Sequence, residues 1–272
     1  MDRRKIAPIG VFDSGVGGLT VAREIIRQLP NENIIYFGDT ARVPYGSKSQ
    51  DSIIRFSEQI IRFLQTKQVK AIVIACNTAS ALALDTVQKE FDIPILGVVV
   101  PGARAAVEAT VNGKVGVAGT DATVRSQMYT KIIQKMNPEI TVIEKACPLF
   151  VPLVEEGFKE HQVTREIIDY YLKSLKDTEI DTMILGCTHY PLLRSKIRTY
   201  MGEKIQIVNP AYETAMDLRD LLEMQGMAND GSAANGVCEF YVSDAAEKFN
   251  EFANSVMPFD IMSTRVIQIE NY

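Results

Sequence analysis

The chain has 272 residues, of which 46% are hydrophobic and 23% are charged, with a formal net charge of -5 and a pI of about 5.3. Hydrophobic content at this level predicts a folded core, in one large or two modest domains, and excludes a disordered chain. No run rich in lysine and arginine occurs, and no stretch approaches about 20 apolar residues, so we expect neither a nucleic-acid partner nor a membrane span.

Short apolar runs rich in β-branched residues recur along the whole chain. Most are continuous rather than alternating, which is typical of strands buried on both faces of a parallel sheet. The predicted strands are Ile9–Phe12, Ile34–Phe37, Ala71–Ala75, Ile95–Val99, Val115–Ala118, Thr141–Ile143, Thr182–Gly186, Ile205–Val208 and Val237–Val242.

Helical patterns separate these runs. The clearest one places five apolar residues on one face of a helix: Ile53, Phe56, Ile60, Phe63 and Leu64. Asp51 or Ser52 is the expected N-cap of this helix. Alternation of strands and helices predicts an open α/β architecture.

Two pairs of segments suggest an internal repeat. Ile9–Gly15 resembles Val115–Asp121, and Ala71–Ser80 resembles Thr182–Pro191, in the same order in each half. Chance similarity between buried strands is the alternative explanation. We interpret the chain as two similar open α/β domains with mainly parallel sheets, related by a pseudo-two-fold axis.

The boundaries between these domains are expected at two interruptions of the pattern. Pro101 and Gly102 mark the first crossing, and Pro210 marks the return. The first domain would then comprise residues 1–98 plus 209–272, and the second residues 99–208.

Two of the four cysteines have matching surroundings. Cys76 in "VIACNTAS" and Cys187 in "LGCTHYPL" each end a buried run, where an open parallel sheet binds its ligands. A helix that starts at such a place stabilises a thiolate. Four cysteines are too few for a disulfide scaffold, so we expect reduced thiols and a cytoplasmic protein.

Three functions fit such a pair of cysteines. A redox dithiol lacks its C-x-x-C spacing here, and a metal site using His189 lacks a further Cys or His pair, so we expect no metal. In the third function, the two sulfurs face each other across a substrate and invert the configuration of one of its carbon atoms. One thiolate removes a proton from one face of this carbon, and the opposite thiol delivers a proton to the other face. Each cysteine could instead be a small buried hydrophobe, which is our interpretation of Cys147 and Cys238.

A glycine-rich turn follows the first predicted strand. Asp13 and Ser14 precede Gly15, Gly17 and Gly18, which allow a tight turn and close backbone approach. The spacing is not the dinucleotide fingerprint. The turn could bind a carboxylate through its N–H groups, or Asp13 could simply cap the following helix.

Short polar side chains follow both cysteines: Asn77, Thr78, Thr188 and His189. They suit bonding to the ammonium and carboxylate of a small substrate, although the threonines could be helix caps. His189 could polarise the substrate, assist Cys187, or be a buried and merely satisfied histidine. Glu155 or Glu156 could reach the same cleft, and the sequence does not choose between them.

Five motifs in this order resemble the glutamate racemases of the cofactor-independent aspartate/glutamate racemase family: "GVFDSGVGGLTV", "GDTARVPYG", "ACNTAS", "CPLFVPLVEEG" and "LGCTHYPLL". The resemblance extends from about Ile9 to Thr214. It implies two α/β domains with the active site in the cleft between them. It also implies interconversion of L- and D-glutamate without pyridoxal phosphate or any other cofactor, supplying D-glutamate for peptidoglycan synthesis.

The resemblance further assigns roles to residues. Cys76 and Cys187 would be the two catalytic acid–base groups, assisted by Asp13, Glu155 and His189. The substrate would contact Asp13, Ser14, Tyr45, Gly46, Asn77, Thr78, Thr188 and His189. Many relatives have Asp-Ser where this chain has Asn209-Pro210, which leaves the hinge there in doubt.

Other functions remain compatible with the sequence. Another member of the superfamily, such as an aspartate racemase, would use the same two cysteines. A two-lobed binding module would close on an amino acid without chemistry, and a redox switch would form a disulfide between Cys76 and Cys187. A homodimer is expected for an enzyme of this size.

Overall fold

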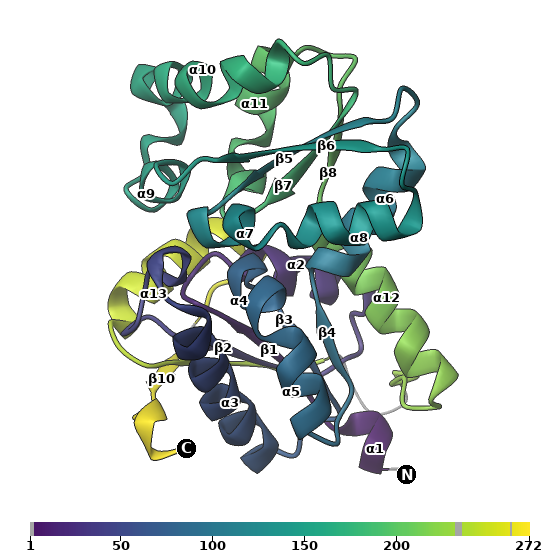
Figure 1. The fold of residues 1–272 in the computed structure, drawn as a ribbon. Helices are drawn as coiled ribbons and strands as arrows, with labels where there is room; N and C mark the ends of the chain where they lie inside the picture. The colour runs from purple at the N-terminus through teal and green to yellow at the C-terminus, as the bar shows by residue number, and fades with distance from the viewer. Residues whose placement is uncertain (1–2, 232–235, 262) are drawn as a thin grey trace.

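A computed structural model describes residues 3–231, 236–261 and 263–272 of the chain. These residues form two α/β units, one stacked on the other, with both chain ends on the first unit (Figure 1). The first unit holds a six-stranded sheet in the order β10-β9-β2-β1-β3-β4, and the second a four-stranded sheet in the order β6-β5-β7-β8. All neighbouring strands run parallel.

The strands of the first sheet are β1 (Ile9–Asp13), β2 (Ile34–Gly38), β3 (Ala71–Ile74), β4 (Ile95–Gly97), β9 (Cys238–Val242) and β10 (Thr264–Val266). Those of the second are β5 (Lys114–Gly119), β6 (Thr141–Ala146), β7 (Thr182–Gly186) and β8 (Gln206–Val208). The order β2-β1-β3-β4 has the same connectivity as β6-β5-β7-β8. The expected pair of similar, parallel α/β halves is therefore confirmed, with β1 matching β5 and β3 matching β7.

Helices cover both faces of each sheet. The first unit contains α1 (Arg3–Ile6), α2 (Leu19–Gln28), α3 (Gln50–Thr66), α4 (Asn77–Leu82), α5 (Leu84–Glu90), α12 (Pro210–Met224) and α13 (Ala246–Val256). The second contains α6 (Val99–Ala109), α7 (Asp121–Ser126), α8 (Met128–Met136), α9 (Phe150–Glu155), α10 (Gln162–Lys176) and α11 (Arg194–Met201). Single 3₁₀ turns lie at Tyr45–Ser47, Phe158–Glu160, Tyr190–Leu193 and Ile269–Asn271.

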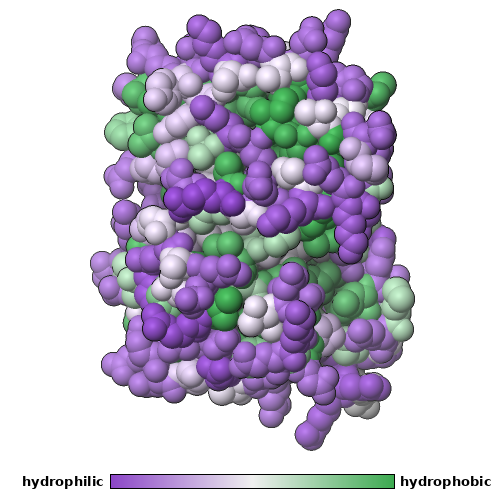
Figure 2. All heavy atoms as spheres, viewed as in Figure 1, coloured by the Kyte–Doolittle hydropathy of each residue, from purple (hydrophilic) through white to green (hydrophobic). Residues whose placement is uncertain are grey.

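Side chains on opposite faces of each sheet pack into separate hydrophobic cores. In β1, Ile9 and Val11 join the core made with α2, α12 and α13, whereas Phe12 joins the core made with α3, α4 and α5. The second sheet is covered by α9, α10 and α11 on one face and by α6 and α8 on the other. Polar side chains cover much of the surface in Figure 2, with hydrophobic atoms in smaller areas between them. Burial on both faces explains why the inner strands β1, β2, β3 and β7 are continuous apolar runs.

All nine predicted strands are present, with ends shifted by a few residues. The largest error is the run Ile95–Val99, because the strand ends at Gly97 and α6 begins at Val99. The Ser80 hydroxyl accepts the Val99 N–H at 3.3 Å and turns the chain there. Pro101 is compatible with the helix because the first N–H groups of a helix have no partner within it.

Two local features were not predicted correctly. The N-cap of α3 is Ser49, whose hydroxyl accepts the Ser52 N–H at 3.3 Å, rather than Asp51 or Ser52. β10 is a short edge strand of sequence Thr-Arg-Val, and it lacks the apolar run that identifies a buried strand.

The chain enters the second unit through α6 and leaves it through α12, and these helices pack together. A Cβ atom at Gly102 would lie 2.8 Å from Pro210 Cγ, so this glycine permits the close contact. Arg104 on α6 forms two hydrogen bonds, of 2.5 and 3.1 Å, with the Asp217 carboxylate on α12. Each sheet takes all its strands from one of the two predicted domains. The exact limits of these domains, 1–98 plus 209–272 and 99–208, stay a prediction.

The Asn209-Pro210 pair starts α12. The Asn209 side chain is the N-cap and accepts the Ala211 N–H at 3.3 Å, and Pro210 occupies the first turn. Both residue types favour a helix start, so the local sequence is well suited to this crossing.

No helix within the described part of the chain combines the length and the apolar character that crossing a membrane requires.

A buried ion pair joins distant parts of the first unit and leads to a stability prediction. Lys70 Nζ lies 2.5 Å from Glu32 Oε2 and donates to the carbonyls of Lys5 and Met227, at 2.6 and 2.9 Å. Both charged side chains are 2% exposed. We expect Lys70→Met to lower the free energy of unfolding by about 3–5 kcal/mol in urea titrations, because it leaves a buried carboxylate without its cation.

The control is the exposed pair of Arg198 and Glu203, joined at 3.0 Å. Arg198→Met should cost less than about 1 kcal/mol, since water already solvates both groups. Adding Glu32→Gln to Lys70→Met should recover part of the lost stability. Equal losses for Lys70→Met and Arg198→Met would contradict the role given to the buried pair.

Candidate active site

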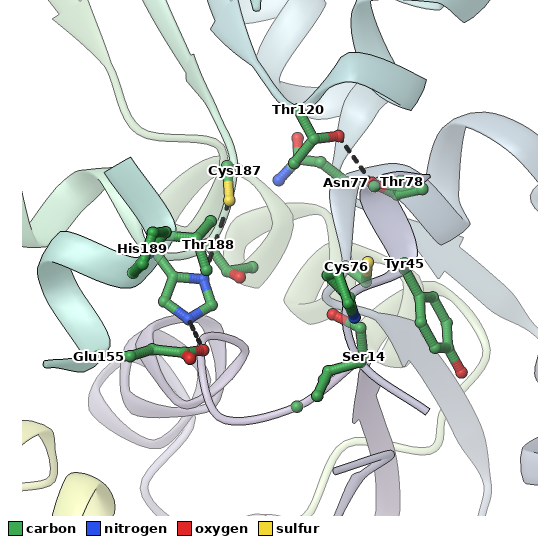
Figure 3. Close-up of a pocket in the computed structure, with 16 residues that line it drawn as sticks. Ser14, Tyr45, Cys76, Asn77, Thr78, Thr120, Glu155, Cys187, Thr188 and His189 are labelled. Carbon is green, nitrogen blue, oxygen red and sulfur yellow. Dashed lines mark hydrogen bonds and ion pairs between the residues drawn. The ribbon is translucent and has the colours of Figure 1, made fainter. Parts of the chain in front are cut away.

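A cavity of about 330 Å³ lies where the carboxyl ends of the two sheets meet. Ser14 follows β1, Cys76 follows β3, Thr120 follows β5 and Cys187 follows β7, so both units contribute matching loops. The remaining wall comes from the 43–46 loop and α9 (Figure 3). The lining residues are Ser14, Gly15, Val43, Pro44, Tyr45, Gly46, Cys76, Asn77, Thr78, Thr120, Val151, Pro152, Glu155, Cys187, Thr188 and His189.

The two cysteines of the matching motifs share this cavity. Cys76 and Cys187 are 5% and 6% exposed, and they stand on different sides of the open space in Figure 3. Cys147 is fully buried in the core of the second unit, and Cys238 lies in β9. Neither of these lines the cavity, as expected for structural cysteines.

Cys76 is the N-cap of α4, and its sulfur accepts the Ala79 N–H at 3.5 Å. We expected this helix start to favour a thiolate. Instead, burial and the negative charge of Asp13 raise the pKa of the Cys76 thiol to about 12, and the Ala79 N–H offsets only part of this. The protonated thiol of Cys76 is therefore favoured at neutral pH.

Asp13 lies beneath the glycine turn and does not line the cavity itself. Its Oδ2 accepts the Gly15 N–H at 3.0 Å, whereas Oδ1 has no hydrogen-bond partner within the described residues. Burial raises the pKa of Asp13, and the charge on His189 opposes this rise. Asp13 thus lies behind the wall to which Ser14 contributes.

Cys187 is held differently from Cys76. No α-helix starts at this cysteine, because a 3₁₀ turn at Tyr190–Leu193 separates it from α11. Its sulfur lies 3.8 Å from His189 Nδ1, and His189 Nε2 lies 2.9 Å from Glu155 Oε1 (Figure 3). The expected helix N-terminus at Cys187 is thus replaced by a histidine–carboxylate pair.

The pair is charged at neutral pH. Burial opposes a charge on His189, but Cys187 and Glu155 outweigh burial and raise the pKa of the imidazole to about 10. Burial likewise opposes ionisation of Glu155, but the hydrogen bond and charge of His189 lower its pKa overall. A protonated imidazole can therefore donate from Nδ1 towards the Cys187 sulfur and from Nε2 to Glu155.

Contacts from the first unit fix the ring of His189. A Cβ atom at Gly17 would lie 2.4 Å from His189 Nδ1, so only glycine permits this close approach. The ring centroids of His189 and Phe252, on α13, are 6.1 Å apart. Thr20 donates to the Thr188 carbonyl at 2.9 Å. His189 therefore depends on packing between the two units.

The structure decides between the two candidate glutamates. Glu155 lines the cavity and pairs with His189. Glu156 is exposed, and its Oε1 lies 3.6 Å from Lys248 Nζ. His161 is exposed at the N-terminus of α10, where its Nδ1 accepts the Val163 N–H.

The predicted residues of the 45–46 loop line the cavity. The ring of Tyr45 is 2% exposed, and its hydroxyl donates to the buried Asp39 carboxylate, which also binds Arg42. The hydroxyl is thus engaged outside the cavity.

Thr120 is a lining residue that was not predicted. Its hydroxyl lies 2.9 Å from that of Thr78 and 3.0 Å from that of Thr123, which joins the loops of the two units. A signal was present, because the repeat of Ile9–Gly15 in Val115–Asp121 aligns Thr120 with Ser14. The apolar residues Val43, Pro44, Val151 and Pro152 were also not predicted.

No group of three or more His, Cys, Asp or Glu residues that could hold a metal ion occurs in residues 3–231, 236–261 and 263–272.

Comparisons with known proteins agree on one family. The model of the Asp/Glu/Hydantoin racemase family matches residues 9–217. A glutamate racemase of Geobacter metallireducens is 48% identical over 90% of this chain and 91% of its own length. A solved glutamate racemase isoform from Bacillus anthracis superposes with a TM-score of 0.93 at 40% identity, covering 97% of this chain and 98% of that one. The glutamate racemase of Francisella tularensis, solved with D-glutamate, gives a TM-score of 0.92 at 38% identity, covering 98% and 100%.

The charged pair of His189 and Glu155 leads to a pH prediction. Because the pKa of His189 rises from 6.5 to about 10, its charge stabilises the fold fully below about pH 6.5. That contribution is lost as the pH rises towards 10. Glu155→Gln should lower the pKa of His189, and nitrogen-15 NMR of the imidazole rings should record this change.

The chain has two histidines, so His161→Asn assigns the His189 signals and serves as the control variant. Chemical denaturation between pH 6.5 and 10 should show a smaller pH-dependent loss of stability for Glu155→Gln. An unchanged His189 titration in that variant would refute the pairing.

Proposed function

Because the chain belongs to the Asp/Glu/hydantoin racemase family, we propose that it interconverts L- and D-glutamate by proton transfer between Cys76 and Cys187. The observation that carries the proposal is that both sulfurs line a single small cavity, one from each unit. The relatives named glutamate racemases support the substrate, including the one solved with D-glutamate. No cofactor takes part in the proposed reaction.

Inversion at the α-carbon needs one proton removed and one delivered on opposite faces. One sulfur, as a thiolate, takes the α-proton, and the electron pair stays on the substrate next to its carboxylate. The other sulfur, as a thiol, gives its proton to the opposite face. The two sulfurs have then exchanged protonation states, which prepares the reaction in the reverse direction.

The surroundings of the two sulfurs favour different protonation states before the reaction. Cys76 is held as a thiol by burial and by the charge of Asp13, so it can donate a proton. The cationic His189 beside Cys187 stabilises negative charge on that sulfur, and Glu155 stabilises the cation in turn. The pair thus supplies one acid and one base before the substrate reacts.

The remaining wall would bind the polar groups of glutamate. Ser14, Asn77, Thr78 and Thr188 are short side chains with hydrogen-bonding groups, and Gly46 adds backbone close to the cavity. A volume of about 330 Å³ lies at the small end of ligand sites, which suits a free amino acid. Asp13, placed below the wall, would tune Cys76 rather than bind the substrate.

We also propose that the D-glutamate is used for peptidoglycan synthesis, which rests on the family resemblance. The expected homodimer stays a prediction.

Proton exchange with solvent distinguishes a racemase from a binding module. In deuterium oxide, L-glutamate should become D-glutamate with deuterium at the α-carbon, since the delivered proton comes from an exchanged thiol. Early in the reaction the remaining L-glutamate should still carry protium, because a different sulfur serves each face. Mass spectrometry of the separated enantiomers measures both. Binding without exchange would exclude the proposed activity.

Replacing either sulfur tests the two-base mechanism. Cys76→Ser and Cys187→Ser should each lower the racemisation rate by about 10³-fold or more, because a hydroxyl is a far weaker acid than a thiol. Cys147→Ser is the matched control, since this buried cysteine lies outside the cavity wall. If one serine variant keeps near-normal activity, the symmetric mechanism is wrong. A Cys76–Cys187 disulfide needed for function would favour the redox switch instead.

A further inference from the structure

Tyr129 reaches the cavity wall from the second unit without lining the cavity. It lies in the first turn of α8 and is fully buried among the side chains between α8, α6 and the second sheet. Its hydroxyl donates to Asn77 Oδ1 at 2.7 Å. Asn77 begins α4 in the first unit and is a lining residue. One hydrogen bond therefore joins the interior of the second unit to the site.

The tyrosine ring packs tightly against the second sheet. A Cβ atom at Gly186, in β7, would lie 3.1 Å from Tyr129 Cε2, which is closer than ordinary contact. At Gly102, in α6, a Cβ atom would make an ordinary contact of 3.5 Å with the hydroxyl oxygen. The closely packed side chains and backbone around Tyr129 thus hold its hydroxyl in a fixed position.

The bond determines which end of the Asn77 amide faces the substrate. An amide has an acceptor oxygen and a donor nitrogen, and either could point into the cavity. Burial raises the pKa of Tyr129, so its hydroxyl keeps the proton that it donates to Asn77 Oδ1. The amide nitrogen then points into the space between the cysteines (Figure 3).

We propose that Tyr129 is a positioning residue that orients the Asn77 amide so that its N–H groups bind a carboxylate of the substrate. The inference rests on the proposed racemase function and adds the chemical group that this wall recognises. A donor facing the cavity favours a carboxylate oxygen and disfavours the ammonium group, which has no acceptor. The substrate would then be oriented by a contact that depends on both units.

The test is Tyr129→Phe, which removes one hydroxyl and keeps the ring in the core. The amide loses its partner and can turn its oxygen towards the substrate, so we expect KM for glutamate to rise about tenfold or more. The α-carboxylate gains negative charge as the α-proton leaves, whereas the side-chain carboxylate does not, so a fall in kcat beside the rise in KM would assign the contact to the α-carboxylate. Steady-state racemisation assays in both directions give the two constants separately.

Tyr241→Phe is the matched control. Tyr241 is likewise a buried tyrosine with a hydrogen-bonded hydroxyl, which donates to the Glu239 carboxylate at 2.6 Å, but it lies in β9 and outside the cavity wall. Its KM should be unchanged. Thermal unfolding of both variants shows whether each is folded at the assay temperature.

A double-mutant cycle separates positioning from general structure. In an Asn77→Ala background, Tyr129→Phe should produce no further rise in KM, because the amide that it orients is absent. Independent effects of the two changes would overturn the inference, as would an unchanged KM or a fall in kcat alone. If the wild-type protein does not racemise glutamate, the proposed function itself fails, so the two failures are distinguishable.

Discussion

Parallel strand pairing is the constraint on which the rest of this structure depends. It brings the ends of β1 and β3 to one edge of the first sheet and those of β5 and β7 to one edge of the second. Because the units meet through these edges, four loops that are distant in sequence line one cavity. The shared connectivity β2-β1-β3-β4 and β6-β5-β7-β8 explains why the loops are arranged in matching pairs.

The matching loops carry different electrostatics. Cys76 has a buried carboxylate nearby, that of Asp13, whereas Cys187 has a cationic imidazole, that of His189. In a poorly solvated cavity such neighbours act strongly on a thiol. A backbone repeat thus supplies two equivalent positions, and the side chains around them differ in charge.

Hydrogen bonds between the units hold this arrangement together. Thr20 binds the carbonyl of Thr188, Thr78 binds Thr120, and Tyr129 binds Asn77. Each joins a cavity loop of one unit to a residue of the other. The geometry around both sulfurs therefore depends on the packing of the two units, to which the contact between α6 and α12 contributes.

The sequence by itself determined the α/β class, nine of the strands, the repeat and the two cysteine loops, since these follow from local apolar runs and motif order. Only the tertiary structure showed that Glu155 rather than Glu156 pairs with His189, that Thr120 joins the wall, and that a 3₁₀ turn rather than an α-helix follows Cys187. It also reversed the expectation for Cys76, whose helix start predicted a thiolate but whose burial favours the thiol. The physical reason is common to these cases: burial and contacts between distant segments set them, and neither can be read from the spacing of residues along one strand or helix.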